Sequence, residues 1–205
     1  MSPRTKEQSE QLRIMRTQQI IAAAEQAFLE QGTNLDIRDV AKKADLGYGT
    51  VYHYYNNKHA LLHDVMIKGL QLAEEATRHI FSTPDHPLVQ VERYCHDMPL
   101  HWAKHPASFA VFKVASENFV GVDEDWTEEV RFRFQQNLYN PVADCLQRAI
   151  TAKQVSPRHD AEQTANAIIG AMIGCYGIYF YHGTFTVDPS FITNALLLGI
   201  REERA

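Results

Sequence analysis

Apolar residues recur at three- and four-residue steps along most of the chain, which is the spacing of one buried face of an α-helix. The first such run ends at Gly32, a residue suited to a helix C-cap. A long run begins at Lys58 and ends before Pro84, because proline disfavours a helical residue ahead of it. Five later runs predict helices over residues 87–105, 108–118, 126–153, 160–182 and 189–203. No alternating pattern is long enough for a useful strand, so the sequence predicts an all-α fold.

Capping residues and prolines refine these helices. Asp125 with Glu128 resembles a capping box at the start of one helix. Asp188 before Pro189 predicts an N-cap followed by proline at the first helical position. Two further prolines lie inside predicted helices, where each removes a backbone donor and should kink the helix: Pro99 and Pro141.

Two short helices are predicted between the first long helix and the second. Asp36 can cap the first, which stops near Ala44 and carries apolar residues on its inner face: Ile37, Val40 and Ala41. After a tight turn the second short helix runs over residues 50–55 until two asparagines end it. Such a pair forms a helix-turn-helix, which lays its second helix in the major groove of DNA while the first braces against the backbone.

The second short helix is crowded with side chains that carry polar tips. Hydroxyls and ring nitrogens that could meet phosphates or base edges come from Tyr48, Thr50, Tyr52, His53 and Tyr54, and Gly49 leaves room for close backbone approach. The alternative is that these aromatics are core residues of a helical bundle. However, neighbouring helical positions point about 100° apart, so the four consecutive aromatics at 52–55 cannot share one core. We expect Val51 and one tyrosine to point inward.

The segment from about Arg13 to Met66 resembles the DNA-binding domain of the TetR family. The matching stretches, in order, are residues 21–28, Ile37-Arg38-Asp39-Val40-Ala41, Gly49-Thr50-Val51-Tyr52-His53-Tyr54-Tyr55, Asn57-Lys58 and Leu61-Leu62. The resemblance implies that these residues meet DNA: Arg38, Tyr48, Gly49, Thr50, Tyr52, His53 and Lys58.

The sequence departs from the family pattern at three positions of the helix-turn-helix. Asp45 stands where the family usually has glycine, and Gly47 where it usually has a serine-like cap. Aspartate can adopt the left-handed conformation and glycine is an acceptable N-cap, so the turn should still form. At the position of Tyr48 the family commonly has a basic or polar residue. This difference bears on which bases the protein prefers, and not on whether it binds DNA.

The resemblance also implies two domains. Residues 1–57 form a DNA-binding domain, and residues 58–205 form a ligand-binding and dimerisation domain in which 58–82 is the connecting helix. In the family the last two helices pair with those of a second copy. The sequence agrees, because one helix has a strip of small residues and the other has apolar faces that a monomer would struggle to bury. The strip comprises Ala167, Gly170, Ala171, Gly174 and Cys175, and the apolar faces carry Phe191, Ala195, Leu198 and Ile200. The alternative is packing within one subunit.

A pocket for a small apolar or amphipathic effector is expected between the middle helices, although most aromatic residues there must simply form core. Its predicted walls comprise Tyr94, His101, Trp102, Phe109, Phe112, Trp126, Phe134 and Tyr176, with Phe119, Tyr139 and Tyr179 as further aromatics of the same region. Asp97, His101 and His105 follow at four-residue steps, but Pro99 distorts that turn, so no metal site is expected.

Composition and charge limit the other classes of protein. The net charge of −5 argues against a protein that coats nucleic acid indiscriminately. The first 58 residues carry 8 basic and 7 acidic side chains, so the basic surface is expected at the amino-terminal end. Three widely spaced cysteines and a polar start favour a reduced, cytoplasmic protein. The apolar stretch 167–181 is shorter than the roughly 20 residues of a membrane span. No phosphate loop, nucleophile elbow or zinc motif occurs, so we expect neither an enzyme nor a cofactor.

The sequence therefore predicts a homodimeric regulator, specifically a repressor, that binds a palindromic operator in double-stranded DNA and is released by a small-molecule effector. The alternative is a ligand-independent repressor or DNA-bound adaptor of the same fold. An enclosed cavity would favour the first and a filled core the second.

Overall fold

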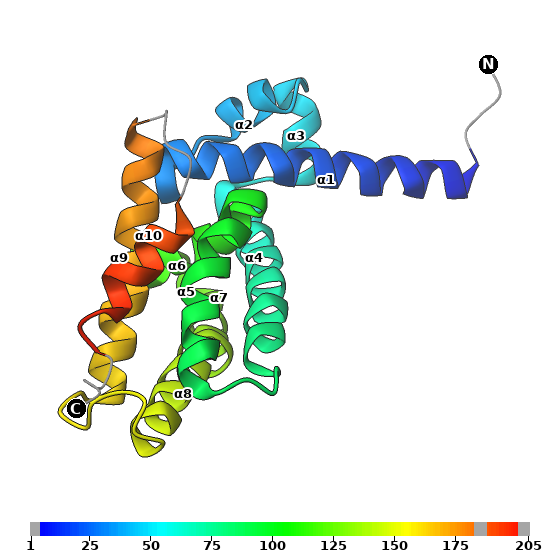
Figure 1. The fold of residues 1–205 in the computed structure, drawn as a ribbon. Helices are drawn as coiled ribbons and strands as arrows, with labels where there is room; N and C mark the ends of the chain where they lie inside the picture. Colours follow the sequence, from blue (N-terminus) through cyan, green and yellow to red (C-terminus); the bar gives the residue numbers. More distant parts are fainter. Residues whose placement is uncertain (1–4, 183–187, 201–205) are drawn as a thin grey trace.

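The computed structural model describes residues 5–182 and 188–200, with side chains through residue 178 and again from residue 188. These residues form helices and no strand, which confirms the predicted all-α fold (Figure 1). In chain order the elements are α1 Lys6–Gln31, the 3-10 turn η1 Gly32–Asn34, α2 Ile37–Lys43, α3 Tyr48–Tyr54, α4 Lys58–Phe81, α5 Pro87–Lys104, α6 Pro106–Ser116, α7 Glu124–Phe134, the π-helical turn η2 Gln135–Tyr139, α8 Asn140–Thr151, α9 Ala161–His182 and α10 Pro189–Leu197.

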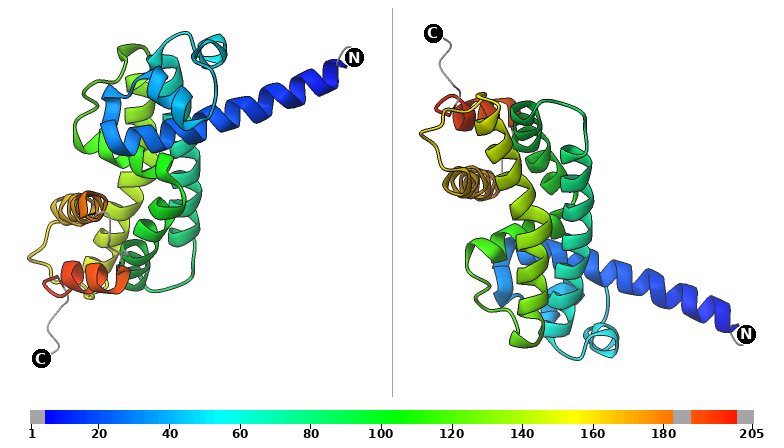
Figure 2. Two further views of the ribbon diagram at one scale, coloured as in Figure 1. Left: turned by 90° about the horizontal axis from the view of Figure 1, so that it is seen from above. Right: turned by 90° about the horizontal axis from the view of Figure 1, so that it is seen from below.

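Helix α1 starts well before its apolar pattern does. Thr5 and Gln8 form a capping box, in which the Gln8 N–H donates to Thr5 Oγ1 at 3.2 Å and the Thr5 N–H donates to Gln8 Oε1 at 3.1 Å. At the other end Gly32 ends the helix with a φ of 60°, as its type predicts. The first buried residue is Ile20, so the preceding turns project beyond the body (Figures 1 and 2).

The region predicted as one helix over residues 126–153 is divided. Asp123 is the N-cap, accepting from the Asp125 N–H at 3.0 Å, so the capping box expected of Asp125 and Glu128 is wrong. The π turn η2 separates α7 from α8 immediately before Pro141, which has no N–H to continue a regular ladder.

The other boundaries follow the expected signals more closely. Pro99 lies inside α5, which continues to Lys104. Asp188 caps α10 as predicted, accepting from the N–H groups of Ser190 and Phe191. Helix α10 ends at Leu197 rather than continuing, and residues 201–203 of the expected helix lie outside the described part of the chain.

One continuous apolar core joins the amino-terminal helices to the rest of the molecule. It runs from Ile20 and Phe28 of α1 through Leu61 and Leu70 of α4 to Met172 of α9. Helix α4 therefore begins beside the short helices and extends through the body (Figure 1). None of the helices in the described part of the chain could span a membrane.

Candidate nucleic-acid interface

The α2–turn–α3 unit is built by local signals in the sequence. Asp36 accepts the Arg38 N–H at 2.7 Å and starts α2, whose buried residues are Ile37, Val40 and Ala41, as predicted. Asp45 takes the left-handed conformation with a φ of 51°, and the Leu46 N–H then donates to the Ala41 carbonyl at 3.0 Å. Gly47 is the extended N-cap of α3. Both unusual turn residues thus fit a regular helix-turn-helix.

Helix α3 separates its side chains into an inner and an outer face. Val51 and Tyr55 point inward and are buried, and the Tyr55 hydroxyl donates to Asp64 Oδ2 at 2.8 Å. Burial, followed by that hydrogen bond, raises the pKa of Tyr55 above its ordinary value, so the hydroxyl stays protonated. The predicted inward tyrosine is therefore Tyr55. Tyr54 is half-buried against the edge of the His53 ring.

The outer face of α3 carries most of the residues expected to meet DNA. Tyr48 is 47% exposed and Tyr52 50% exposed, and their ring centroids lie 5.8 Å apart. The Arg38 guanidinium lies 5.9 Å from the centre of the Tyr48 ring, which brings α2 into the same surface. The remaining outer residues are also exposed: Gly49, Thr50 and His53. A Cβ at Gly49 would meet no atom within 4 Å, so the fold itself does not require glycine there.

Lys58 differs from the other candidates in its surroundings. It begins α4, is half-buried, and its Nζ donates to the Thr33 carbonyl at 3.3 Å. A phosphate contact would require the ammonium to share or exchange this partner.

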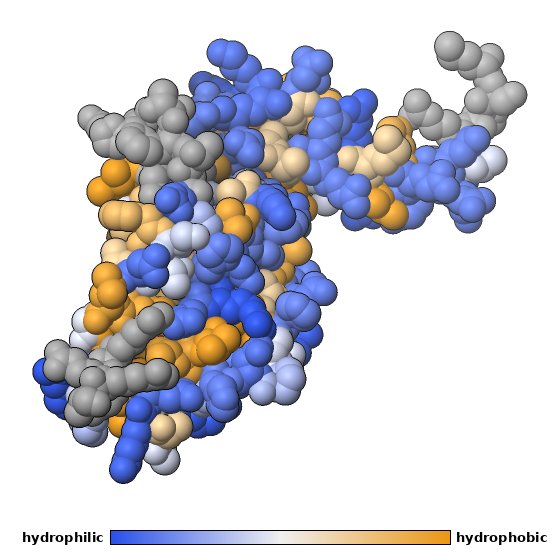
Figure 3. Space-filling model, in the orientation of Figure 1, coloured by the Kyte–Doolittle hydropathy of each residue, from blue (hydrophilic) through white to orange (hydrophobic). Residues whose placement is uncertain are grey.

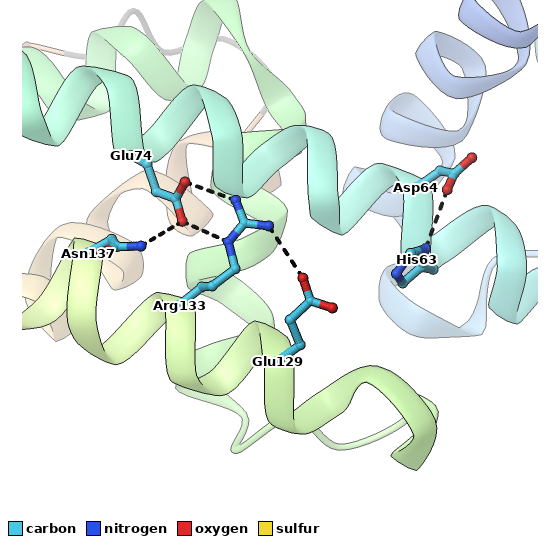
Figure 4. Close-up of polar contacts among 6 residues, drawn as sticks. All are labelled: His63, Asp64, Glu74, Glu129, Arg133 and Asn137. Carbon is cyan, nitrogen blue, oxygen red and sulfur yellow. Dashed lines mark hydrogen bonds and ion pairs between the residues drawn. The ribbon is translucent and has the colours of Figure 1, made fainter.

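Helix α4 connects the recognition helix to the far side of the body through polar contacts that the sequence does not reveal. Near its start, Asp64 accepts the Tyr55 hydroxyl and lies 3.4 Å from His63 Nδ1. Further along, Arg133 of α7 donates twice to the Glu74 carboxylate at 2.9 Å, and Asn137 of η2 donates to it at 3.0 Å (Figure 4). Arg133 also lies 3.7 Å from Glu129.

This bidentate pair stays ionised. Burial would raise the pKa of Glu74, but the hydrogen bonds from Arg133 and Asn137, together with the charge of Arg133, lower it overall. A second ion pair joins α4 to α1, and it is formed by Lys68 with the buried Glu25. Polar contacts therefore tie α4 both to α1 and to α7 with η2.

Five of the predicted pocket residues form one aromatic cluster. Trp102 contacts Phe109, Phe112 and Tyr176 at centroid distances of 5.5, 4.9 and 5.4 Å, and Phe134 contacts Phe112 at 5.4 Å. The other three candidates lie apart from these rings. Tyr94 stacks on Phe81, Trp126 meets His63, and His101 lies 3.0 Å from the Ser108 hydroxyl. The side chain of Tyr179 is outside the described residues.

Two polar atoms of the predicted pocket residues, one outside the Trp102 cluster and one within it, are buried without a hydrogen-bond partner among the described residues: the Tyr94 hydroxyl and Trp102 Nε1. Burial raises the pKa of Tyr94, so its hydroxyl keeps its proton and remains a donor. Buried polar groups normally find a partner, so both atoms require an explanation.

Helices α9 and α10 expose apolar and small residues along one side of the molecule (Figure 3). Ala167, Gly170 and Gly174 of the predicted strip are exposed, while Ala171 is half-buried. Phe191 is 67% and Leu198 74% exposed, and Ile178, which the sequence did not single out, is 60% exposed.

Among the described side chains, histidines and cysteines do not assemble into a recognisable site. Asp97 pairs with His96 at 2.7 Å, and the His101 ring lies 4.6 Å from that of His105. Within the ranges that the structure describes, no three His, Cys, Asp or Glu side chains are placed to hold a metal ion. All three cysteines are free thiols, and burial raises the pKa of Cys95 to about 12 and that of Cys145 to about 11.

An all-α body joined to an exposed second helix of a helix-turn-helix is the architecture expected of a DNA-binding protein. Residues 20–65 match the family model for bacterial regulatory proteins of the tetR family. Residues 20–65 therefore carry a TetR-type DNA-binding domain, and proteins of the TetR family are DNA-binding transcriptional regulators and not enzymes.

Solved structures share the fold over nearly the whole chain. The ketosteroid transcriptional regulator KstR2 of Mycobacterium tuberculosis has a TM-score of 0.76 and 17% identity, covering 92% of this chain and 96% of its own. AibR, solved with isovaleryl coenzyme A and operator DNA, has a TM-score of 0.73 and 13% identity, covering 91% and 98%. FadR of Bacillus subtilis, solved with stearoyl-CoA, has a TM-score of 0.66 and 15% identity, covering 92% and 99%. No curated protein sequence matches the chain.

Proposed function

We propose that the protein is a repressor that binds a palindromic operator as a homodimer and leaves it when a small apolar or amphipathic effector binds. The observation that carries this proposal is the division of α3, whose inner face is anchored by Val51 and Tyr55 while its outer face is open. One short recognition helix reads too few base pairs to specify a site, so two copies are needed, with half-sites about 34 Å apart.

The outer face supplies the chemistry that DNA recognition requires. Thr50 and Tyr52 offer hydroxyl groups, His53 offers ring nitrogens, and Arg38 with Tyr48 offers a planar cation and ring. Gly49 permits close approach of the backbone to DNA, since nothing in the fold itself needs glycine there. Lys58 would contact a phosphate after giving up the Thr33 carbonyl.

The proposed division of the chain places DNA binding in residues 1–57 and dimerisation and ligand binding in residues 58–205. The exposed residues of α9 and α10 support a partner on that side, because monomers rarely leave so much apolar surface uncovered. Small residues such as Gly170 and Gly174 would let helices of the two copies approach closely.

The proposed effector site is the aromatic region around Trp102, for which the unpartnered Trp102 Nε1 provides support. A ligand that supplies an acceptor for this donor would relieve its burial cost. The amphipathic isovaleryl coenzyme A bound by AibR is one example of such chemistry in this fold. The ligand must prefer the DNA-incompetent state, and a tilt of α4 would change the spacing of the two recognition helices.

Hydroxyl deletions on α3 test DNA recognition directly. An operator is first selected from a random duplex pool by the full-length chain, and binding is measured by fluorescence anisotropy at several salt concentrations. Thr50→Ala and Tyr52→Phe should each weaken binding roughly tenfold, the value of one hydrogen bond to a charged phosphate, without creating a cavity. Lys58→Ala should also lower the salt slope by about one unit.

The matched control is Tyr139→Phe, which removes a hydroxyl that donates to the Glu162 carbonyl, away from the helix-turn-helix. It should leave operator affinity unchanged. Unchanged affinity in all of the α3 variants would show that this helix does not read DNA.

The second candidate is a ligand-independent repressor or DNA-bound adaptor, which is favoured by the direct ring-to-ring packing around Trp102. Native mass spectrometry of the protein from cell extract separates the two. A bound compound that also releases the operator supports the effector reading, and its absence together with full operator occupancy supports the second candidate.

A further inference from the structure

The first turns of α1, residues 6–18, form an arm that projects from the body on the side away from α9 and α10 (Figures 1 and 2). Most of its surface is hydrophilic (Figure 3). At 1.5 Å per residue the arm is about 20 Å long, which is the rise of roughly six base pairs. The proposed function places these residues in the DNA-binding domain but gives none of them a contact.

One face of the arm is basic or hydroxylated. With about 100° between successive residues, an arc of roughly 100° holds Lys6, Ser9, Arg13, Arg16 and Thr17. Glu10 borders this arc, while Glu7 and the exposed apolar Ile14 and Met15 lie outside it.

This face borders a groove of about 600 Å³ between the arm and the end of the recognition helix. Ser9, Arg13 and Thr17 line one wall, and His53 and Tyr54 line the other. Tyr55 and Asp64 complete the lining, and the Asp64 carboxylate is already engaged by the Tyr55 hydroxyl. Arg13 has no ion-pair or hydrogen-bond partner among the described residues, so its guanidinium is available to an anion.

The arm is held in a fixed position relative to the helix-turn-helix. Gln19 Nε2 donates to the Ala44 carbonyl at the end of α2, at 2.6 Å. Arg16 in turn donates to Gln19 Oε1 at 2.8 Å. The basic face is therefore oriented before any ligand binds, which lowers the ordering cost of binding.

We propose that this arm is a second DNA-binding element, which grips the phosphate backbone on the outer flank of each half-site. The occupant is DNA because the groove opens directly beside the outer face of α3 and carries unpartnered positive charge. In a dimer formed through α9 and α10 the two arms would lie on the outer sides of the molecule, because each projects away from those helices. The inference rests on the proposed function. With the arm bound, the protein would contact a longer stretch of the operator.

Two duplexes test the arm. One ends at the outer edges of the selected half-sites, and the other continues for roughly ten base pairs on each side, about one turn of DNA. The wild-type protein should bind the longer duplex roughly tenfold more tightly at 0.1 M salt, with a steeper salt slope, because each phosphate contact adds about 0.9 to the slope.

Arg13→Gln should remove most of this difference while leaving affinity for the short duplex nearly unchanged, and Lys6→Gln should remove part of it. Arg158→Gln is the charge-matched control, because Arg158 is an exposed arginine in the turn before α9. It should keep the full preference for the long duplex.

Equal affinity and salt slope of the wild-type protein on both duplexes would overturn the arm proposal while leaving operator binding intact. A changed sedimentation coefficient for Arg13→Gln with unchanged DNA binding would also overturn it, assigning the arm to a protein contact. Failure of the proposed function is different: no sequence preference would emerge on either duplex, and Thr50→Ala would have no effect.

Discussion

At the scale of single residues, His101 links two helices through a chain of hydrogen bonds. The Ser108 hydroxyl donates to the Gly69 carbonyl of α4 at 3.3 Å, so Ser108 Oγ accepts from His101 Nε2. Burial, followed by the charges of His105 and Lys104, lowers the pKa of His101 to about 4. The ring is therefore neutral at pH 7 with its proton on Nε2.

This lowered pKa predicts a pH-dependent loss of stability. Between pH 6.5 and about 4 the unfolded chain binds a proton at His101 that the folded chain does not, so the free energy of unfolding falls as the pH falls through that window. Urea unfolding at pH 7 and pH 5 should show a smaller loss in His101→Gln than in the wild type. His79→Gln changes an exposed histidine and should behave like the wild type. An equal loss in all three proteins would contradict the role of His101.

At the scale of helices, the crossing of α4 over α6 depends on the absence of a side chain. A Cβ on Gly69 would overlap the Ala107 carbonyl and press on Val111. This close approach also brings the Ser108 hydroxyl within reach of the Gly69 carbonyl. Helix α4 is thus held against α6 by backbone contact, between its ties to α3 and α7.

Gly69→Ala should therefore destabilise the protein by about 1–3 kcal/mol, the usual cost of overpacking a core, although alanine favours a helix by about 1 kcal/mol over glycine. Gly49→Ala is the control, because a methyl group there meets no atom within 4 Å, and it should be neutral or slightly stabilising. The free energies of unfolding come from urea titration without DNA. If Gly69→Ala were as stable as the wild type, α4 and α6 could not be as close as described.

At the scale of the whole molecule, a substitution on the exposed side of α9 and α10 should affect association of two copies and not the folding of one. A Cβ on Gly174 meets nothing within 4 Å in the chain, so a larger side chain costs the fold little. In the proposed dimer the same side chain would push the paired helices apart.

Gly174→Leu should consequently abolish the dimer and preserve the helical fold. Sedimentation velocity should report a monomer while far-ultraviolet circular dichroism and the urea midpoint show a folded chain. Gly174→Ala, with only one added methyl group, should keep more of the dimer. A stable dimer carrying leucine would place the interface on another surface.

Much of the secondary structure and the location of the DNA-binding unit could be predicted from the sequence, because both depend on local signals. Helix periodicity identified the core faces, and Asp36, Gly32 and Asp188 set helix ends through their own side chains or conformations. Where the local signal was ambiguous the prediction failed: Asp123 and not Asp125 caps α7. The turn with Asp45 and Gly47 also followed from what these two residue types can adopt.

Contacts between distant segments were decided only by the tertiary structure. Nothing near Glu74 in the sequence indicates its pairing with Arg133, and nothing near Tyr55 indicates which of the clustered tyrosines reaches Asp64. The polar arm of α1 has no apolar period, so it emerged only from its capping box and its position beside α3. Hydrophobic periodicity indicates that a residue is buried. Which residue it contacts depends on how the helices cross, as the rings around Trp102 and the close approach at Gly69 demonstrate.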